Sequence, residues 1–239
     1  MWARKRLDIR WRDFLAGRLA CIACWNRLAA SERLEATWDS PDNSLACLSV
    51  RSGLDLFLTA AAWPAGSEIL ISALTIPDMA RIIRHHSLVP VPVDLDPLSA
   101  APTIQSLQDA ITPQTRAILV AHLLGTRIPL EPILKFSRDH DLVMIEDCAQ
   151  AFVGPQWTGT PGTLVSMFSF GTIKTATAFG GALLTVRDPS VLAAMRKTQS
   201  TWPVSSRLGY GFRLAKYGAL KVLSGRLTFS AFVAACRLL

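Results

Sequence analysis

Residues 116–150, RAILVAHLLGTRIPLEPILKFSRDHDLVMIEDCAQ, contain the unit that decides the fold. The stretch begins and ends with apolar runs, RAILVAHLLG and LVMIEDCAQ, of the length expected for buried strands. Between them, LEPILKFSRDH carries apolar residues at helical spacing. A strand, a helix and a second strand in this order predict two parallel strands joined by a crossover helix.

The same alternation continues on both sides of this unit. We expect further strands at 68–72, 89–96, 164–171 and 180–188, and helices ending before Pro64 and over 77–87 and 103–111. The pattern predicts an α/β protein, a three-layer α/β/α sandwich around a mixed, mostly parallel sheet. In such sheets ligands bind just beyond the carboxyl ends of the strands.

The two ends of the chain differ from this alternating middle. Trp2, Leu7 and Trp11 recur at near-helical spacing between arginines, and the regular alternation stops after Asp188. The predicted organisation is a helical arm over 1–44, a large domain over 45–190, and a basic helical segment over 191–239 that begins an incomplete C-terminal region.

Composition limits the class of protein. Half of the 239 residues are hydrophobic and 18% are charged, which is typical of a folded chain with a substantial core and not of a disordered one. No uncharged apolar run is long enough to span a bilayer. The basic N-terminus is not followed by the apolar core of a signal peptide, so we expect a cytoplasmic protein.

The net charge of +7 is concentrated near the C-terminus, because residues 190–239 hold eight Lys or Arg and no Asp or Glu. This local excess argues against nucleic-acid binding, which would spread basic residues over the fold. The basic segment Arg207–Arg226 is interpreted as a solvated face, as a contact with membrane lipid, or as a contact with the diphosphate of a nucleotide sugar. The sequence leaves these alternatives open.

Two charged residues stand where burial is expected. Asp147 follows the apolar run LVMI at a strand end, and Gln150 lies three residues further on. Lys174 is the one charged residue of SFGTIKTATAFGGALL, residues 169–184. Taken alone, Asp147 would be a cap or a salt-bridge partner, and Lys174 would belong to a surface turn.

Taken together, this acid and this lysine are the pair that pyridoxal phosphate requires. Apolar surroundings lower the pKa of a lysine, which favours a Schiff base with the cofactor aldehyde. A carboxylate keeps the pyridine nitrogen of the cofactor protonated. The Ser52–Gly53 turn, at the start of the first helix of the large domain, and Ser169 are candidate phosphate ligands.

The remaining polar residues do not predict a metal site. The adjacent residues His85 and His86 face different directions on a helix. His122 stands at a strand end near the expected site, where we expect it to make a structural hydrogen bond.

The ordered set of motifs resembles the DegT/DnrJ/StrS family of pyridoxal-phosphate-dependent sugar aminotransferases, which have the type I aminotransferase fold. The matching pieces lie between Ser49 and Asp188 and are the SG turn at 52–53, PVPVDLD at 90–96, AHLLG at 121–125, IEDCAQA, and FSFGTIK followed by GG. The resemblance implies that Lys174 carries the cofactor aldehyde and Asp147 contacts the pyridine nitrogen. It also implies that Gln150 contacts the ring, and that Ser169 and the Ser52–Gly53 turn bind the phosphate.

Two positions depart from the family pattern. Ile76 stands where relatives usually have an aromatic residue or histidine that stacks on the cofactor ring. Leu54 replaces the threonine of the usual Ser-Gly-Thr turn. Each change is expected to weaken cofactor binding by about 1–2 kcal/mol, the size of a lost stacking contact or hydrogen bond.

The resemblance implies an enzyme that moves an amino group, with glutamate as the expected donor, to a keto sugar carried on a nucleotide. It also implies a homodimer, since a second subunit completes the site in relatives, and a role in polysaccharide or glycoside biosynthesis. A sugar dehydratase is disfavoured because such relatives replace the lysine by histidine. The other alternative is a truncated or inactive remnant that binds a partner through its basic C-terminal segment.

Overall fold

The computed structural model describes residues 9–23, 26–174 and 176–236. It divides into two compact units, a larger one of residues 31–202 and a smaller one that combines the described residues up to 30 with those from 203 onward. The three segments expected from the sequence remain a prediction. Trp2 and Leu7 of the expected arm lie outside the described residues.

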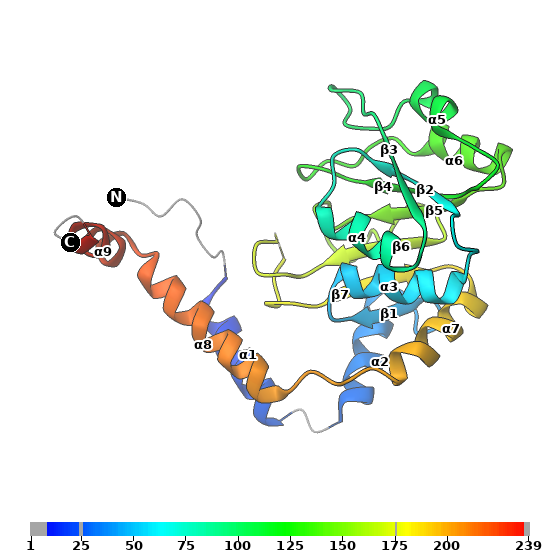
Figure 1. Cartoon of the computed structure of the whole chain (residues 1–239). Coiled ribbons are helices and arrows are strands. Elements are labelled where there is room, and N and C mark those ends of the chain that lie inside the picture. The colour runs from blue at the N-terminus through cyan, green and yellow to red at the C-terminus, as the bar shows by residue number, and fades with distance from the viewer. Residues whose placement is uncertain (1–8, 24–25, 175, 237–239) are drawn as a thin grey trace. The chain divides into compact units, whose positions relative to one another are not determined.

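Within the described residues, seven strands form a single mixed sheet in the larger unit (Figure 1). In spatial order they are β1 (Ser44–Cys47), β7 (Ala182–Val186), β6 (Val165–Ser169), β5 (Val143–Asp147), β4 (Thr115–Ala121), β2 (Glu68–Ser72) and β3 (Val89–Val93). β7 is antiparallel to both of its neighbours, and the other pairs are parallel. The predicted mixed, mostly parallel sheet is therefore confirmed.

Helices cover both faces of this sheet, which confirms the three-layer prediction (Figure 1). One face packs against α3 (Val50–Ala61), α4 (Pro77–His85) and α7 (Pro189–Ser200). The other face packs against α5 (Ile104–Ala110) and α6 (Glu131–Asp139). Most of the buried hydrophobic residues are Leu, Ile and Val.

Alternation along the central strands divides the core between the two faces. In β2, Ile69 and Ile71 join the cluster beneath α3, whereas Leu70 joins the cluster beneath α6. Side chains of a strand point alternately to opposite faces, and both faces are covered, so the central positions of β2 and β4 are all apolar. This is why the sequence shows continuous apolar runs instead of an apolar–polar alternation.

Local signals set the ends of the covering helices. Ser49 caps α3, and its hydroxyl and that of Ser52 form a reciprocal capping box. At the other end, Ala62 adopts a left-handed conformation (φ 47°) two residues before Pro64. Asp188 caps α7 by accepting hydrogen bonds from the backbone N–H groups of Ser190 and Val191.

The sequence did not predict β1 as a strand. Its four residues, SLAC, are shorter than a recognisable apolar run, and β1 forms by pairing with β7 at the edge of the sheet. The remaining helices are α1 (Trp11–Ala23), α2 (Arg27–Trp38), α8 (Arg207–Leu223) and α9 (Arg226–Cys236). Trp38 at the end of α2 is buried against the ring of Phe168 in β6 (centroids 4.8 Å apart).

Candidate active site

A cavity of about 260 Å³ opens at the carboxyl ends of the parallel strands. Four successive segments supply its walls, those that follow β2, β4, β5 and β6. The lining residues are Leu74, Thr75, Ile76, Ala121, His122, Leu123, Leu124, Asp147, Ala149, Gln150 and Lys174. The cavity therefore lies where ligands bind in open α/β sheets.

Asp147 is the last residue of β5 and is half-buried. Its carboxylate accepts a hydrogen bond from the backbone N–H of Ala149 (2.9 Å), which fixes the direction of the side chain. Burial raises the pKa of Asp147, while the Ala149 N–H and the charge of Lys174 act in the opposite direction. A cation or a cationic ring in the cavity would therefore be strongly attracted to this carboxylate.

Gln150 links two walls of the cavity. Its side-chain oxygen accepts a hydrogen bond from the backbone N–H of Leu124 (3.1 Å), so the turn after β5 is tied to the loop after β4. Leu124 has a left-handed backbone (φ 57°), and its side chain is 85% exposed. The amide group of Gln150 keeps two N–H donors at the rim.

Lys174 lies in the loop between β6 and β7. Its backbone N–H donates to the oxygen of Gly171 (3.0 Å), which closes a tight turn, and the base of the loop is closed by Phe170 N–H donating to Gly181 (3.0 Å). Gly180 and Gly181 have φ angles of 153° and 94°, a backbone that favours glycine. Burial lowers the pKa of Lys174, and the charge of Asp147 opposes this shift.

Ser169 ends β6 beside the lysine turn. Its hydroxyl oxygen accepts a long hydrogen bond from the backbone N–H of Gly171 (3.5 Å). A Cβ placed on Gly171 would lie 3.6 Å from that hydroxyl and 3.9 Å from Cγ of Lys174. The structure thus brings Ser169 next to the lysine, although Ser169 is not among the residues that line the cavity.

Ser52 and Gly53 are not among the residues that line this cavity. The hydroxyl of Ser52 donates to the backbone oxygen of Ser49 (2.8 Å) and accepts from its N–H (3.0 Å). Gly53 is buried, and a Cβ there would meet Leu184 at 2.8 Å, so packing accounts for this glycine. Ser52 lines a separate, open hollow with Arg51, and its expected role in binding a phosphate remains a prediction.

Comparison with protein families adds evidence independent of this geometry. The model of the DegT/DnrJ/EryC1/StrS aminotransferase family matches residues 30–221, which include all of the cavity-lining residues. The chain belongs to this family. Its members are pyridoxal-phosphate-dependent aminotransferases, as the resemblance predicted.

The chain matches only part of the length of each of its named relatives. GDP-perosamine synthase of Caulobacter vibrioides is 32% identical over 203 residues, which are 81% of this chain and 54% of that protein. The UDP-N-acetyl-3-dehydro-alpha-D-glucosamine 3-aminotransferase of Acidithiobacillus ferrooxidans is 31% identical over 186 residues, 74% of this chain and 50% of that protein. The chain thus spans about half the length of these relatives.

Solved structures establish the fold. The aminotransferase TlmJ from Streptoalloteichus hindustanus superposes with a TM-score of 0.76 at 20% identity, over 91% of this chain and 66% of that one. DesI, crystallised with its TDP-sugar product, superposes with a TM-score of 0.68 at 23% identity, over 82% of this chain and 51% of that one. The expectation of the type I aminotransferase fold is confirmed.

The residues of the cavity fit the family cofactor. An amine with a lowered pKa, a desolvated carboxylate and a carboxamide line the same cavity, and these are the groups that an aldehyde, a pyridine nitrogen and a ring require. Ile76, the first departure from the family pattern, immediately precedes α4, lines the cavity and is 48% exposed. Leu54 is fully buried, so the position of the usual threonine belongs to the core.

Sequence reasoning missed a buried network on the opposite face of β5. The side chain of Glu146 is fully buried and accepts hydrogen bonds from Nε2 of His122 (2.8 Å), from Ser166 Oγ (2.6 Å), and from Thr160 Oγ1 and N–H (2.6 and 2.9 Å). Burial alone would raise the pKa of Glu146, but these hydrogen bonds outweigh it and lower the pKa to about 2. The available signal was its position next to Asp147, since adjacent strand residues point to opposite faces.

His122 makes the structural hydrogen bonds expected of it. Its Nδ1 accepts from the backbone N–H of Ile128 (3.0 Å), so Nε2 carries the proton that is donated to Glu146. Through this ring the buried network fixes the loop after β4, which forms one wall of the cavity. Glu146 therefore supports the site without lining it.

Proposed function

We propose that this chain is the cofactor-binding part of an aminotransferase that transfers an amino group from an amino acid, with glutamate as the donor, to the keto group of a nucleotide-linked sugar. The observation that carries the proposal is the convergence of Lys174, Asp147 and Gln150 on one cavity. The names of two relatives, a GDP-perosamine synthase and a UDP-N-acetyl-3-dehydro-alpha-D-glucosamine 3-aminotransferase, support the substrate class. The products would be amino-sugar nucleotides, precursors of polysaccharides or glycosides.

Pyridoxal phosphate, when bound, would supply an aldehyde that accepts an amino group and a ring that withdraws electrons. Lys174 would hold the aldehyde, and Asp147 would hold a proton on the pyridine nitrogen. Gln150 would fix the ring by its N–H groups, with its oxygen already bonded to Leu124. Ser169, together with Ser52 and Gly53, would bind the phosphate.

The lowered pKa of Lys174 suits it to act as the base of the reaction. Its Nζ atom would remove the proton from the amino-bearing carbon of the donor and return a proton to the carbon of the sugar that receives the amine. The half-buried position excludes part of the solvent, so the amine spends more time neutral than an exposed lysine at the same pH.

We propose that the surfaces that close over the sugar and the nucleotide are separate from the residues that line the cavity. The chain spans about half the length of its relatives. We propose that a second copy of the chain contributes to this closure, as a homodimer. The cytoplasmic location stays a prediction.

The test is a single-turnover assay of the first half of the reaction. The purified chain is mixed with pyridoxal phosphate and glutamate, and the amount of 2-oxoglutarate formed per chain is measured. We expect about one equivalent from the wild type, and no product above the free-cofactor background from Lys174→Ala. Lys197→Ala, which removes an exposed lysine of α7, is the matched control and should behave as the wild type.

A chain that binds the cofactor but yields no 2-oxoglutarate would contradict the proposed donor half of the reaction. A chain that neither binds the cofactor nor yields product would favour the alternative of an inactive remnant. Equal product from Lys174→Ala and the wild type would contradict the role of the lysine.

A further inference from the structure

The smaller unit contains an antiparallel pair of helices, α1 and α8 (Figure 1). Near one end of the pair, Nζ of Lys221 lies 5.9 Å from the ring of Trp11, and Gly218 faces Phe14. Nearer the other end, a Cβ on Gly17 would lie 3.2 Å from Leu214. The buried contact between the helices thus involves Phe14 and Leu214 with glycines opposite them.

A second row of α1 begins at Trp11, beside this contact, and is apolar and exposed. It comprises Trp11, Leu15, Leu19 and Ile22, whose exposed fractions are 55%, 59%, 56% and 69%. The spacings of four, four and three residues place them on one side of the helix. At an advance of 100° per residue, this row lies about a third of a turn around the helix from Phe14 and Gly17.

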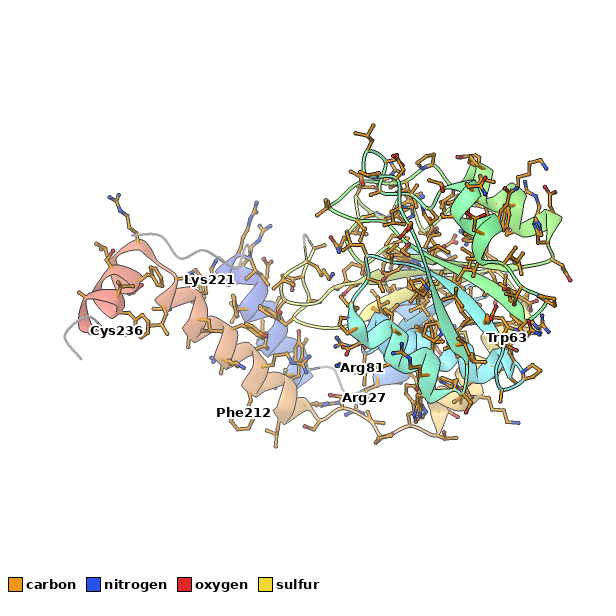
Figure 2. The ribbon with its side chains drawn as sticks, turned by 45° about the horizontal axis from the view of Figure 1, so that its top comes forward. Arg27, Trp63, Arg81, Phe212, Lys221 and Cys236 are labelled. Atoms are coloured by element: carbon orange, nitrogen blue, oxygen red, sulfur yellow. The ribbon has the colours of Figure 1, made fainter. Side chains whose placement is uncertain are left out.

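α8 carries a matching row. Leu208 and Phe212 at its start are 77% and 76% exposed, and Val222 and Leu223 at its end are 51% and 48% exposed. Ala215 and Ala219 continue the same side of the helix between them. Figure 2 shows the labelled side chain of Phe212 on the outer side of α8, away from α1.

The two rows lie on the same side of the pair. In each helix the exposed row is displaced from the buried contact by about 120° in the direction of increasing residue number. Because the helices run antiparallel, these displacements turn the middle of both rows toward one common face, and Phe212 lies at its outer edge. We call this surface the apolar face of α1 and α8.

The surroundings of this face are basic. The described residues of the smaller unit carry nine arginines or lysines and one carboxylate, that of Asp13. Arg18 on α1 and Lys216 on α8 are exposed and lie beside the apolar rows. Helices with Trp, Phe and Leu on one side and arginine and lysine around it are typical of segments that lie in the interface of a membrane.

We propose that the apolar face of α1 and α8 binds to a membrane surface that contains anionic lipids. The apolar rows would enter the headgroup boundary, and the basic residues would contact lipid phosphates. α9 would extend the contact, since none of its described residues is buried and Leu227 and Phe232 are 85% and 55% exposed. The enzyme would thus lie on the membrane by its smaller unit, whichever sugar it acts on.

The basic charge of this surface favours an anionic lipid surface over a second copy of the chain. A second copy of the chain on this face would bring two strongly basic surfaces together, which charge repulsion opposes. Within the described residues no single helix is long and apolar enough to cross a bilayer, and α8 and α9, which are long and apolar enough together, are bent by 83° at their junction.

The test is sedimentation of the full chain with lipid vesicles. Vesicles of phosphatidylcholine alone are compared with vesicles of phosphatidylcholine and phosphatidylglycerol in equal amounts. We expect binding to the anionic vesicles and little to the neutral ones. Phe212→Asp should weaken that binding about tenfold or more, because a charge replaces an aromatic ring that would enter the headgroup boundary. Leu98→Asp, which changes a 97% exposed leucine of the larger unit, is the matched control and should bind as the wild type.

A second pair of variants tests the charge. Arg18→Glu and Lys216→Glu should each weaken binding to anionic vesicles about fivefold or more, and added salt should weaken the wild type. Lys174→Ala should bind vesicles as the wild type, so failure of this inference is distinguishable from failure of the proposed reaction. Equal binding to both vesicle types, no binding to either, or a Phe212→Asp variant that binds normally would overturn it. So would loss of self-association in Phe212→Asp without vesicle binding by the wild type, which would identify the face as a protein interface.

Discussion

At the scale of single residues, Lys174 is explained by its surroundings. It is half-buried, it lines a cavity opposite a carboxylate, and its pKa is lowered by loss of water. A surface lysine would have none of these properties. The glycines at positive φ that close its loop show that the backbone around the lysine is built for this position.

The balance of burial and charge at Lys174 predicts a dependence on pH. The amine reacts with an aldehyde in its neutral form, so cofactor uptake should reach its half-maximal rate at a pH below the ordinary lysine value of 10.5. The charge of Asp147 raises the pKa of Lys174, so Asp147→Asn should move this midpoint to lower pH. The initial rate of the visible absorbance change, measured across pH, gives the midpoint. A midpoint that rises in Asp147→Asn would refute this electrostatic account.

Ile76 offers a gain-of-binding test at the same scale. Its side chain is half exposed and lines the cavity, so a larger ring can be placed there without disturbing the core. Ile76→Phe should tighten pyridoxal phosphate binding about fivefold, the value of one added stacking contact of about 1 kcal/mol. The dissociation constant is measured by absorbance titration, with Leu98→Phe as the off-site control. Weaker binding in Ile76→Phe would show that this residue does not face the ring.

At the scale of elements, β5 carries two neighbouring acids, one on each face of the sheet. Asp147 points into the cavity, and Glu146 points into a buried network that holds the loop carrying His122. Because strand side chains alternate, neither acid can take the role of the other. One strand therefore places a carboxylate in the cavity and also anchors the neighbouring wall of the cavity through His122.

The lowered pKa of Glu146 predicts a loss of stability in acid. Its pKa is about 2 in the folded chain and near 4.5 in the unfolded chain, so its contribution is fully present above pH 4.5 and is lost as the pH falls through about 2. The shift corresponds to about 3 kcal/mol of unfolding free energy. Glu146→Gln should lose this amount at neutral pH and show a flatter dependence between these limits.

Urea unfolding at a series of pH values measures this effect. Glu131→Gln, which changes an exposed acid at the start of α6, is the control and should change the unfolding free energy by less than about 0.5 kcal/mol. A Glu146→Gln variant as stable as the wild type at neutral pH would show that the network is not a structural support.

At the scale of the whole molecule, the larger unit contains the complete cavity and the cores on both faces of the sheet. A shortened chain of residues 27–202, which keeps α2 intact, should therefore bind pyridoxal phosphate within about twofold of the full chain. It should also lose the vesicle binding assigned to α1 and α8. Absorbance titration of both chains measures the first effect. A folded shortened chain that does not bind the cofactor would contradict the assignment of the site to this unit.

The sequence was sufficient to predict the layers of the fold, and it singled out Asp147 and Lys174, which line one cavity in the structure. Period and length alone predicted the strands that became β2, β4 and β5, because buried parallel strands leave continuous apolar runs. The acid at a strand end and the lysine in an apolar loop were recognisable because each was exceptional in its own segment.

The remainder depends on loops, whose paths are set by contacts distant in sequence. Leu124 lines the cavity, and its N–H donates to the side chain of Gln150, 26 residues away. No sequence pattern around either residue predicts this contact. Ser52 illustrates the opposite case, since its local pattern suggests a phosphate ligand while its hydroxyl is engaged in a capping box. β1 escaped prediction because its strand conformation comes from pairing with β7.

The most direct test of the account is to identify the residue that bonds to pyridoxal phosphate. The full chain is incubated with the cofactor, reduced with borohydride, digested and analysed by mass spectrometry. We predict one dominant modified peptide, with the cofactor on Lys174, and a strongly reduced yield in Asp147→Asn. Modification spread over exposed lysines such as Lys135 and Lys197, with Lys174 unmodified, would contradict it.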